Sequence, residues 1–227
     1  MNDNFLTLDQ YSHAKQTVES VFHVESRLPK QVFKRPFRFQ LLCEFDFAMS
    51  DILETLHRMR SPLANESVLL TVLEPDPISF FYKRYQKIYA FYFKADISEN
   101  EYYSIRWHEP KTPANYHKPI QFNTEIETYI PSSLSWAMWG QRSREIAVIG
   151  LDDSLLAKTL IADNGYWMDA ATALCRFAKF PFIDRKVPDD FRRALIANYG
   201  SRADLEKKLG QKVEYSWEQE EPPPRAR

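Results

Sequence analysis

Glycine is scarce in this sequence. The chain has five glycines among 227 residues, and no two of them are near neighbours. Loops that cradle phosphate groups need several glycines close together, because only glycine lets backbone N–H groups come near enough to the ligand. No dinucleotide or P-loop fingerprint can be drawn on this chain, so nucleotide-dependent enzyme classes are not favoured. We expect no cofactor.

Cysteine is rarer still. Cys43 and Cys175 lie far apart in apolar surroundings, and such thiols are usually reduced core side chains rather than a disulfide or a zinc pair. Residues 1–10 carry two acidic and no basic side chains, and no apolar run typical of a signal peptide follows. No stretch reaches the roughly 18 apolar residues of a membrane-spanning helix. These absences predict a cytoplasmic protein with no membrane partner.

An excess of positive charge is also missing. Thirty basic residues face 31 acidic ones, so the formal net charge is -1, and the strong positive field that nucleic acids require is not expected. The segment 80–87 mixes aromatic with cationic side chains and could stack bases. The favoured alternative is a helical turn that leads into a strand, with the aromatic rings in the core and the Lys and Arg side chains in solvent. We therefore expect no nucleic-acid partner.

What the sequence does contain is hydrophobic and aromatic surface: 44% of its residues are hydrophobic, with 33 Phe, Tyr and Trp side chains. A chain of this length can bury a large core without disulfides or a metal. We expect one α+β domain over residues 1–217, with a mixed, largely antiparallel sheet covered by helices and a helical C-terminal third. Residues 218–227 are acidic and proline-rich, and we expect a disordered tail there.

Periodicity gives the expected elements. Helices are predicted over 9–27, from Ser50 to before Pro62, after Asp152-Asp153, and over 167–178, 188–200 and 201–210. Strands are predicted over 37–47, 67–73, 88–94, 102–107, 134–139 and 144–150. Two antiparallel hairpins are expected, one joining 88–94 to 102–107 and one joining 134–139 to 144–150. In the second hairpin, Gly140 would supply unusual backbone dihedrals at the turn.

Few residues stand out as catalytic or metal-binding. His108, Glu109 and His117 share the proline-containing segment 108–120 and could form part of a metal site, but ligands on a loop are not pre-positioned, and we expect no bound metal. No G-x-S-x-G elbow occurs, and both thiols lie among apolar residues, which disfavours a covalent hydrolase. The sequence leaves open whether the protein is an enzyme and leans against it.

The second predicted hairpin carries Trp136, Trp139, Arg142 and Arg144, and tryptophan and arginine are enriched at protein–protein hot spots. Strand alternation puts the two tryptophans on opposite faces, so we expect one of them in the core and the other at least partly exposed. We assign partner contact to Trp139, Arg142 and Arg144.

The stretch from Ser135 to Ile149, followed by Asp152-Asp153, resembles small bacterial immunity proteins that accompany polymorphic or contact-dependent toxins. The resemblance implies a non-enzymatic cytoplasmic protein that binds a cognate toxin and blocks its active site. The alternative is a small-molecule-binding protein or hydrolase with a pocket near residues 108–120. The sequence does not decide the oligomeric state.

Overall fold

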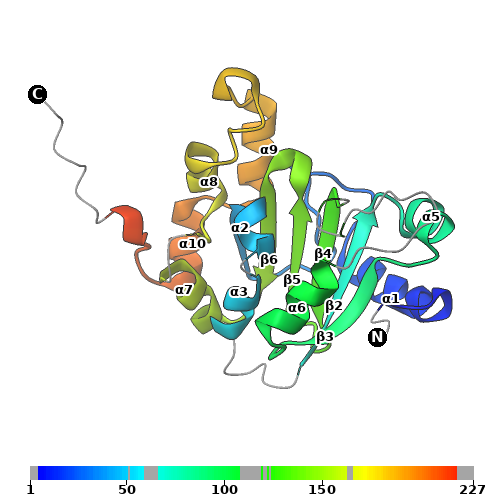
Figure 1. Cartoon of the computed structure of the whole chain (residues 1–227). Helices are drawn as coiled ribbons and strands as arrows, with labels where there is room; N and C mark the ends of the chain where they lie inside the picture. Colours follow the sequence, from blue (N-terminus) through cyan, green and yellow to red (C-terminus); the bar gives the residue numbers. More distant parts are fainter. Residues whose placement is uncertain are drawn as a thin grey trace, which may run out of the picture.

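A computed structural model describes residues 5–50, 52–58, 66–107, 119, 122, 124–162 and 166–218. Its centre is a six-stranded sheet in the order β1-β6-β5-β4-β2-β3 (Figure 1). Every neighbouring pair of strands is antiparallel. The strands are β1 (Phe39–Glu44), β2 (Ser67–Glu74), β3 (Ala90–Lys94), β4 (Ile126–Pro131), β5 (Trp136–Gln141) and β6 (Ile146–Leu151). The predicted α+β class is confirmed.

Helices cover both faces of the sheet. Phe22, directly after α1 (Leu8–Val21), packs its ring 5.5 Å from the ring of Trp139, so α1 lies over the face that carries Trp139. The helices α2 (Phe45–Ser50), α3 (Ile52–Arg58) and α6 (Glu99–Arg106) lie on the opposite side (Figure 1). The sheet is therefore the middle layer, and apolar side chains on both of its faces are buried.

The C-terminal third is helical, as predicted, and lies beyond the edge strand β1 (Figure 1). Met168 forms a backbone bridge with Leu42 of β1, which covers that edge of the sheet. The helices here are α7 (Ser154–Ala162), α8 (Ala170–Arg176), α9 (Asp189–Tyr199) and α10 (Arg202–Leu209), with short 3-10 turns η4 (Ile183–Arg185) and η5 (Ser216–Glu218). None of the helices in the described residues is long and apolar enough to cross a membrane.

Local capping signals set several helix ends. Thr7 and Gln10 form a reciprocal capping box at the start of α1, and Ser201 and Asp204 form another at the start of α10. Gly210 ends α10 in the left-handed conformation, where glycine carries no steric penalty. These signals are short-range, so they can be recognised in the sequence before the fold is known.

The predicted hairpin between 88–94 and 102–107 is wrong, because residues 99–106 form the helix α6. The Ser98 side chain accepts a hydrogen bond from the Glu101 N–H and caps this helix. The partner of β3 is β2, and β2 also pairs with β4, a strand that the sequence analysis did not identify. The segment between β2 and β3 holds the π-helix η1 (Pro77–Tyr82) and the single turn α5 (Lys83–Tyr85).

The second predicted hairpin is confirmed as β5 and β6, but its turn differs from the prediction. The short helix η3 (Arg142–Arg144) joins the strands, and Glu145 has the positive φ of 53°. Gly140 lies inside β5, where a Cβ atom would come within 2.8 Å of the side chains of Met49 and Phe45. Glycine is needed at this position because α2 packs closely on the strand.

Candidate functional site

The turn η3 holds Arg142, one of the predicted contact residues. Its Nε donates a 2.8 Å hydrogen bond to the Thr124 carbonyl, and its guanidinium lies 4.8 Å from the centre of the Phe45 ring. A 3.5 Å ion pair joins it to Asp46, yet the Arg142 side chain stays 37% exposed. Arg142 is thus held in one orientation while part of its charge still faces solvent, as a contact residue requires.

Trp139, the second predicted contact residue, is fully buried, so its assignment as a surface contact is wrong. Trp136 is fully buried too. Alternation correctly separates the two rings onto opposite faces of the sheet, but α1 covers the face that the sequence analysis left exposed. Arg144 is half-buried, with its guanidinium 5.6 Å from the centre of the Phe191 ring. Of the three predicted residues, Arg142 is best placed to meet a partner.

An acidic hollow of about 240 Å³ lies beside Arg142. We use this name for the hollow lined by Glu44, Phe45, Asp46, Arg142 and Glu145. Burial raises the pKa of Glu44 above its ordinary value, and the nearby Glu145 and Asp46 carboxylates raise it further. Three acidic side chains therefore crowd against a single arginine, which leaves negative charge in excess.

A larger groove of about 530 Å³ adjoins the acidic hollow, because Glu44 lines both. We call it the α2–α8 groove, since α2 and α8 lie next to each other at this edge of the molecule (Figure 1). Its other lining residues are mostly apolar or aromatic, with two basic side chains: Cys43, Phe47, Tyr166, Met168, Cys175, Arg176, Phe177, Lys179 and Phe180. The volume falls within the range of roughly 300–1,000 Å³ found for ligand sites.

Exposed aromatic rings line this groove. The Phe47 and Tyr166 rings stack at 4.8 Å and are 42% and 39% exposed, and Phe180 is 42% exposed. Phe47 belongs to α2, Tyr166 precedes α8 and Phe180 follows α8, so no local sequence pattern links them. Large apolar side chains gathered at one exposed place are unusual on a protein surface and mark interaction sites.

The two cysteines also meet at this groove. Cys43 is buried, as predicted, but Cys175 is exposed, so the prediction of two core thiols is wrong for Cys175. The apolar stripe of α8 is formed by Ala170, Ala173 and Leu174, and Cys175 points away from it. No histidine lines the groove in the part of the chain that the structure describes, so neither thiol has an imidazole base beside it there.

A buried polar network lies under α6, on the same face of the sheet as α2. The Arg106 guanidinium donates to the Glu127 carboxylate at 2.5 and 3.3 Å, and to the Tyr129 hydroxyl at 3.3 Å. Tyr102 and Tyr129 share a 3.0 Å hydrogen bond between their hydroxyls. Burial raises the pKa of Tyr102 to about 12, so its hydroxyl stays protonated at neutral pH. All four side chains are enclosed and mutually paired, which indicates a structural role.

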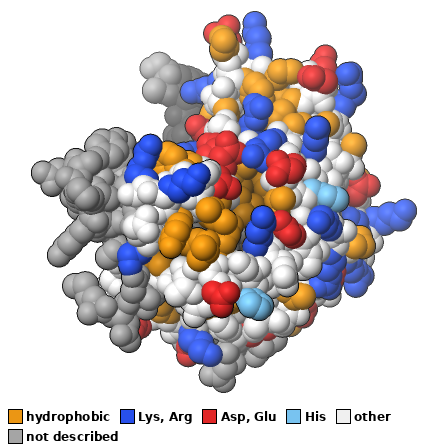
Figure 2. Space-filling model, turned by 90° about the vertical axis from the view of Figure 1, so that its right-hand side faces the viewer, with side chains coloured by type: hydrophobic (Ala, Val, Ile, Leu, Met, Phe, Trp, Pro, Cys, Tyr) orange, Lys and Arg blue, Asp and Glu red, His pale blue; other side chains and the backbone are white. Residues whose placement is uncertain are grey.

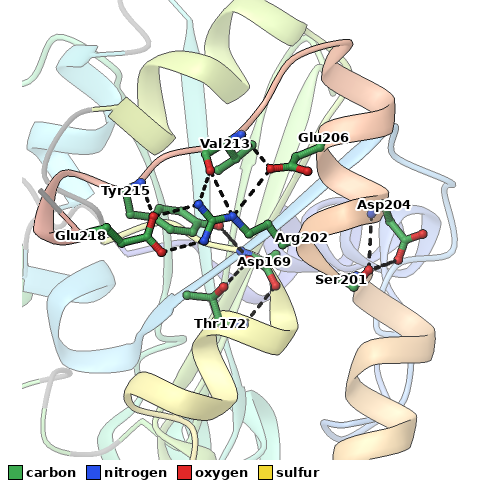
Figure 3. Close-up of polar contacts among 9 residues, drawn as sticks. All are labelled: Asp169, Thr172, Ser201, Arg202, Asp204, Glu206, Val213, Tyr215 and Glu218. Atoms are coloured by element: carbon green, nitrogen blue, oxygen red, sulfur yellow. Dashed lines mark hydrogen bonds and ion pairs between the residues drawn. The ribbon is translucent and has the colours of Figure 1, made fainter.

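A second polar cluster ties the C-terminal segment to α8 and α10 (Figure 3). The Tyr215 hydroxyl donates to Asp169, whose side chain caps α8, and Arg202 binds Glu218 through two hydrogen bonds of 2.6 and 2.8 Å. Glu218, the first residue of the predicted tail, is thus docked, and residues 219–227 lie outside the described residues. Next to this cluster, the Arg176 guanidinium lies 4.1 Å from the centre of the Trp217 ring. The C-terminal segment therefore supports one wall of the α2–α8 groove.

The side of the molecule at α1 and α5 offers a different surface. Figure 2 shows hydrophobic side chains there, surrounded by interspersed basic and acidic ones. In the segment 80–87, Phe81 is buried and the Arg84 guanidinium lies 4.3 Å from the centre of the Phe80 ring. This arrangement matches the predicted helical turn with aromatics in the core. The mixed charges on this side form no continuous basic surface for a phosphate backbone.

Metal binding finds no support in the described residues. No group of three or more His, Cys, Asp or Glu side chains is arranged there to hold an ion. The alternative metal ligands from the sequence, His108, Glu109 and His117, lie outside the described residues, as does most of the segment 108–120. Among the described residues, a pocket lies at α2 and α8.

Comparisons with known proteins give no relative: no protein-family model, curated protein or solved structure matches the chain. Function must therefore be argued from the site itself.

Proposed function

We propose that this chain is a non-enzymatic cytoplasmic protein that binds another protein at the α2–α8 groove and the adjoining turn η3. The observation that carries the proposal is the exposed aromatic cluster of Phe47, Tyr166 and Phe180 beside the anchored Arg142. Aromatic and arginine side chains held rigidly are the usual energetic centres of protein interfaces. Arg144 belongs to the same turn and is assigned to the rim of this surface.

The partner we propose is a cognate bacterial toxin, with this chain acting as its immunity protein. The resemblance of residues 135–149 supports this assignment, and η3 lies within that stretch. An inhibitor of this kind needs a rigid scaffold and a complementary patch but no catalytic group. The sheet, covered on both faces, supplies the scaffold, and the groove supplies the patch.

The experiment is a toxicity assay in a bacterial host. The neighbouring genes are read first for a large secreted protein; the C-terminal domain of such a protein is expressed with and without the chain, and the chain should restore growth. The double variant Tyr166→Ala/Phe180→Ala should lose protection while keeping its melting temperature, because both rings are partly exposed. Tyr92→Ala is the matched control, since Tyr92 is 49% exposed on the opposite edge strand β3.

Two results would overturn the proposal at different levels. If the parent chain does not restore growth, the toxin-inhibitor role is rejected. Protein binding itself is tested by a photo-crosslinking amino acid placed at position 180 or at position 92 in the native host. If a partner is captured equally from both positions, or from neither, the α2–α8 groove is not the binding surface.

The groove volume also suits a small apolar ligand. The second candidate function is therefore small-molecule binding, at the α2–α8 groove rather than near residues 108–120. A small ligand would fill the groove but make no use of Arg142 on η3. The Arg142→Ala variant therefore separates the two functions: it should weaken binding of a protein partner that reaches η3, and it should leave binding of a small ligand confined to the groove unchanged.

A further inference from the structure

We propose that the partner enters the α2–α8 groove with an apolar side chain, preferably methionine or an aromatic residue, placed between a basic residue and an acidic residue. This inference rests on the proposed function and specifies the chemistry of the partner segment. It follows from the charged side chains of the groove and the adjoining acidic hollow, and from the apolar majority of the groove lining.

Acidic side chains lie where the groove adjoins the acidic hollow. Glu44 lines both spaces. Asp46 is 80% exposed, and Arg142, at 3.5 Å, is the cation that lines the hollow with the three acids. A lysine or arginine of the partner would relieve the mutual repulsion of these acids, which the raised pKa of Glu44 also reflects.

The groove lining also carries two cations. They are Arg176 and Lys179, and neither forms an ion pair with a described acidic residue at 4.0 Å or less. Arg176 is exposed and packs on the Trp217 ring, so the C-terminal segment fixes its position. A carboxylate on the partner would meet two cations here. The acids come from β1, α2 and the end of η3, and the cations come from α8 and the residues after it, so the two signs would orient the bound segment.

The apolar part of the groove lining selects an apolar side chain. Met168 and Phe177 are almost fully buried, and Phe47 and Phe180 are partly exposed around them. Two sulfur atoms, from Cys43 and Met168, lie among these rings. Sulfur and aromatic rings attract each other, so methionine or an aromatic side chain fits better here than a small aliphatic one. A fully buried anchor of this type typically carries much of the binding energy of an interface.

The test uses a displayed library of random 12-residue peptides selected against the intact protein. We expect selected peptides to carry Met, Phe, Tyr or Trp, with Lys or Arg on one side and Asp or Glu on the other. Binding of a synthesised consensus peptide should weaken on Phe180→Ala. It should also weaken by roughly five- to tenfold on Asp46→Asn/Glu145→Gln, because two rim charges are removed.

Glu19→Gln is the matched control, because Glu19 is a partly exposed acid on α1, and this variant should bind the peptide as the parent does. Raising the salt concentration should weaken peptide binding by the parent, so that its affinity approaches that of the Asp46→Asn/Glu145→Gln variant. Peptides that depend on Phe180 but show no charge preference would overturn the proposed partner chemistry and leave the binding function intact. Peptides that ignore Phe180 altogether, together with failed crosslinking at position 180, would overturn both.

Discussion

Removing the Glu127 carboxylate should destabilise the protein more than removing any surface charge. Arg106 and Glu127 are 2% and 0% exposed, and the two side chains meet through two hydrogen bonds. Burial alone would lower the pKa of Arg106, but Glu127 and the two tyrosine hydroxyls raise it well above its ordinary value, so Arg106 stays charged. In Glu127→Leu, this buried cation has no counter-charge, which costs about 3–5 kcal/mol.

The assay is equilibrium unfolding in urea, in which the midpoint reports the loss and an unchanged slope shows that the two-state transition is kept. The double variant Arg106→Met/Glu127→Leu should recover most of the lost stability, because no charge is then buried without a partner. Glu74→Gln is the control, since the ion pair of Arg27 with Glu74 is about 40% exposed and should contribute no more than about 1 kcal/mol. If the double variant is as unstable as Glu127→Leu, the explanation through an unpaired buried charge is refuted.

Trp136→Ala and Trp139→Ala should each lower the free energy of unfolding by about 3–5 kcal/mol, because both rings are fully buried; a small effect for Trp139 in urea unfolding would contradict its position under α1. Glu44→Gln should raise stability at pH 7 by less than about 1 kcal/mol, because the folded state holds the Glu44 proton more tightly than the unfolded state does. The gain should vanish as the pH falls through the raised pKa of Glu44. Unfolding midpoints of the variant and the parent at pH 7 and pH 4 test this, and a variant less stable than the parent at pH 7 would contradict it. Removal of residues 218–227 should cost no more than about 1 kcal/mol, because the Glu218 ion pair is near the surface; a loss of several kcal/mol would show a larger role.

The parts of the fold that the sequence predicts are those governed by local chemistry. The capping box of Ser201 with Asp204 and the left-handed Gly210 frame α10 where the sequence places a helix. The alternation in β5 correctly sets Trp136 and Trp139 on opposite faces. Each of these features depends on residues within a few positions of one another.

The failures come from contacts between distant segments. Glu127 lies fully buried in β4 because Arg106 neutralises it from α6, and a charged residue with no visible partner does not suggest a central strand. Trp139 is covered by α1, which comes more than a hundred residues earlier. At 102–107, an apparent two-residue alternation suggested a strand, and the sequence analysis did not consider Ser98, whose side chain caps a helix there.

The candidate site was predictable in one residue only. Arg142 could be recognised as a turn arginine between two strands, and the structure keeps it partly exposed. The aromatic rings of Phe47, Tyr166 and Phe180 come together only when α2 and the α8 segment meet at β1. No spacing in a single sequence encodes that meeting, so the α2–α8 groove required the fold.

The place of β1 at the edge of the sheet has a consequence for synthesis of the chain. Its single strand partner, β6, is made more than a hundred residues later, and the backbone bridge from Met168 comes later still. While the ribosome translates the intervening chain, the apolar strand Phe39–Glu44 has neither of these neighbours. Unpaired apolar strands of this kind are prone to aggregate, so the nascent chain carries this exposed strand until β6 has left the ribosome.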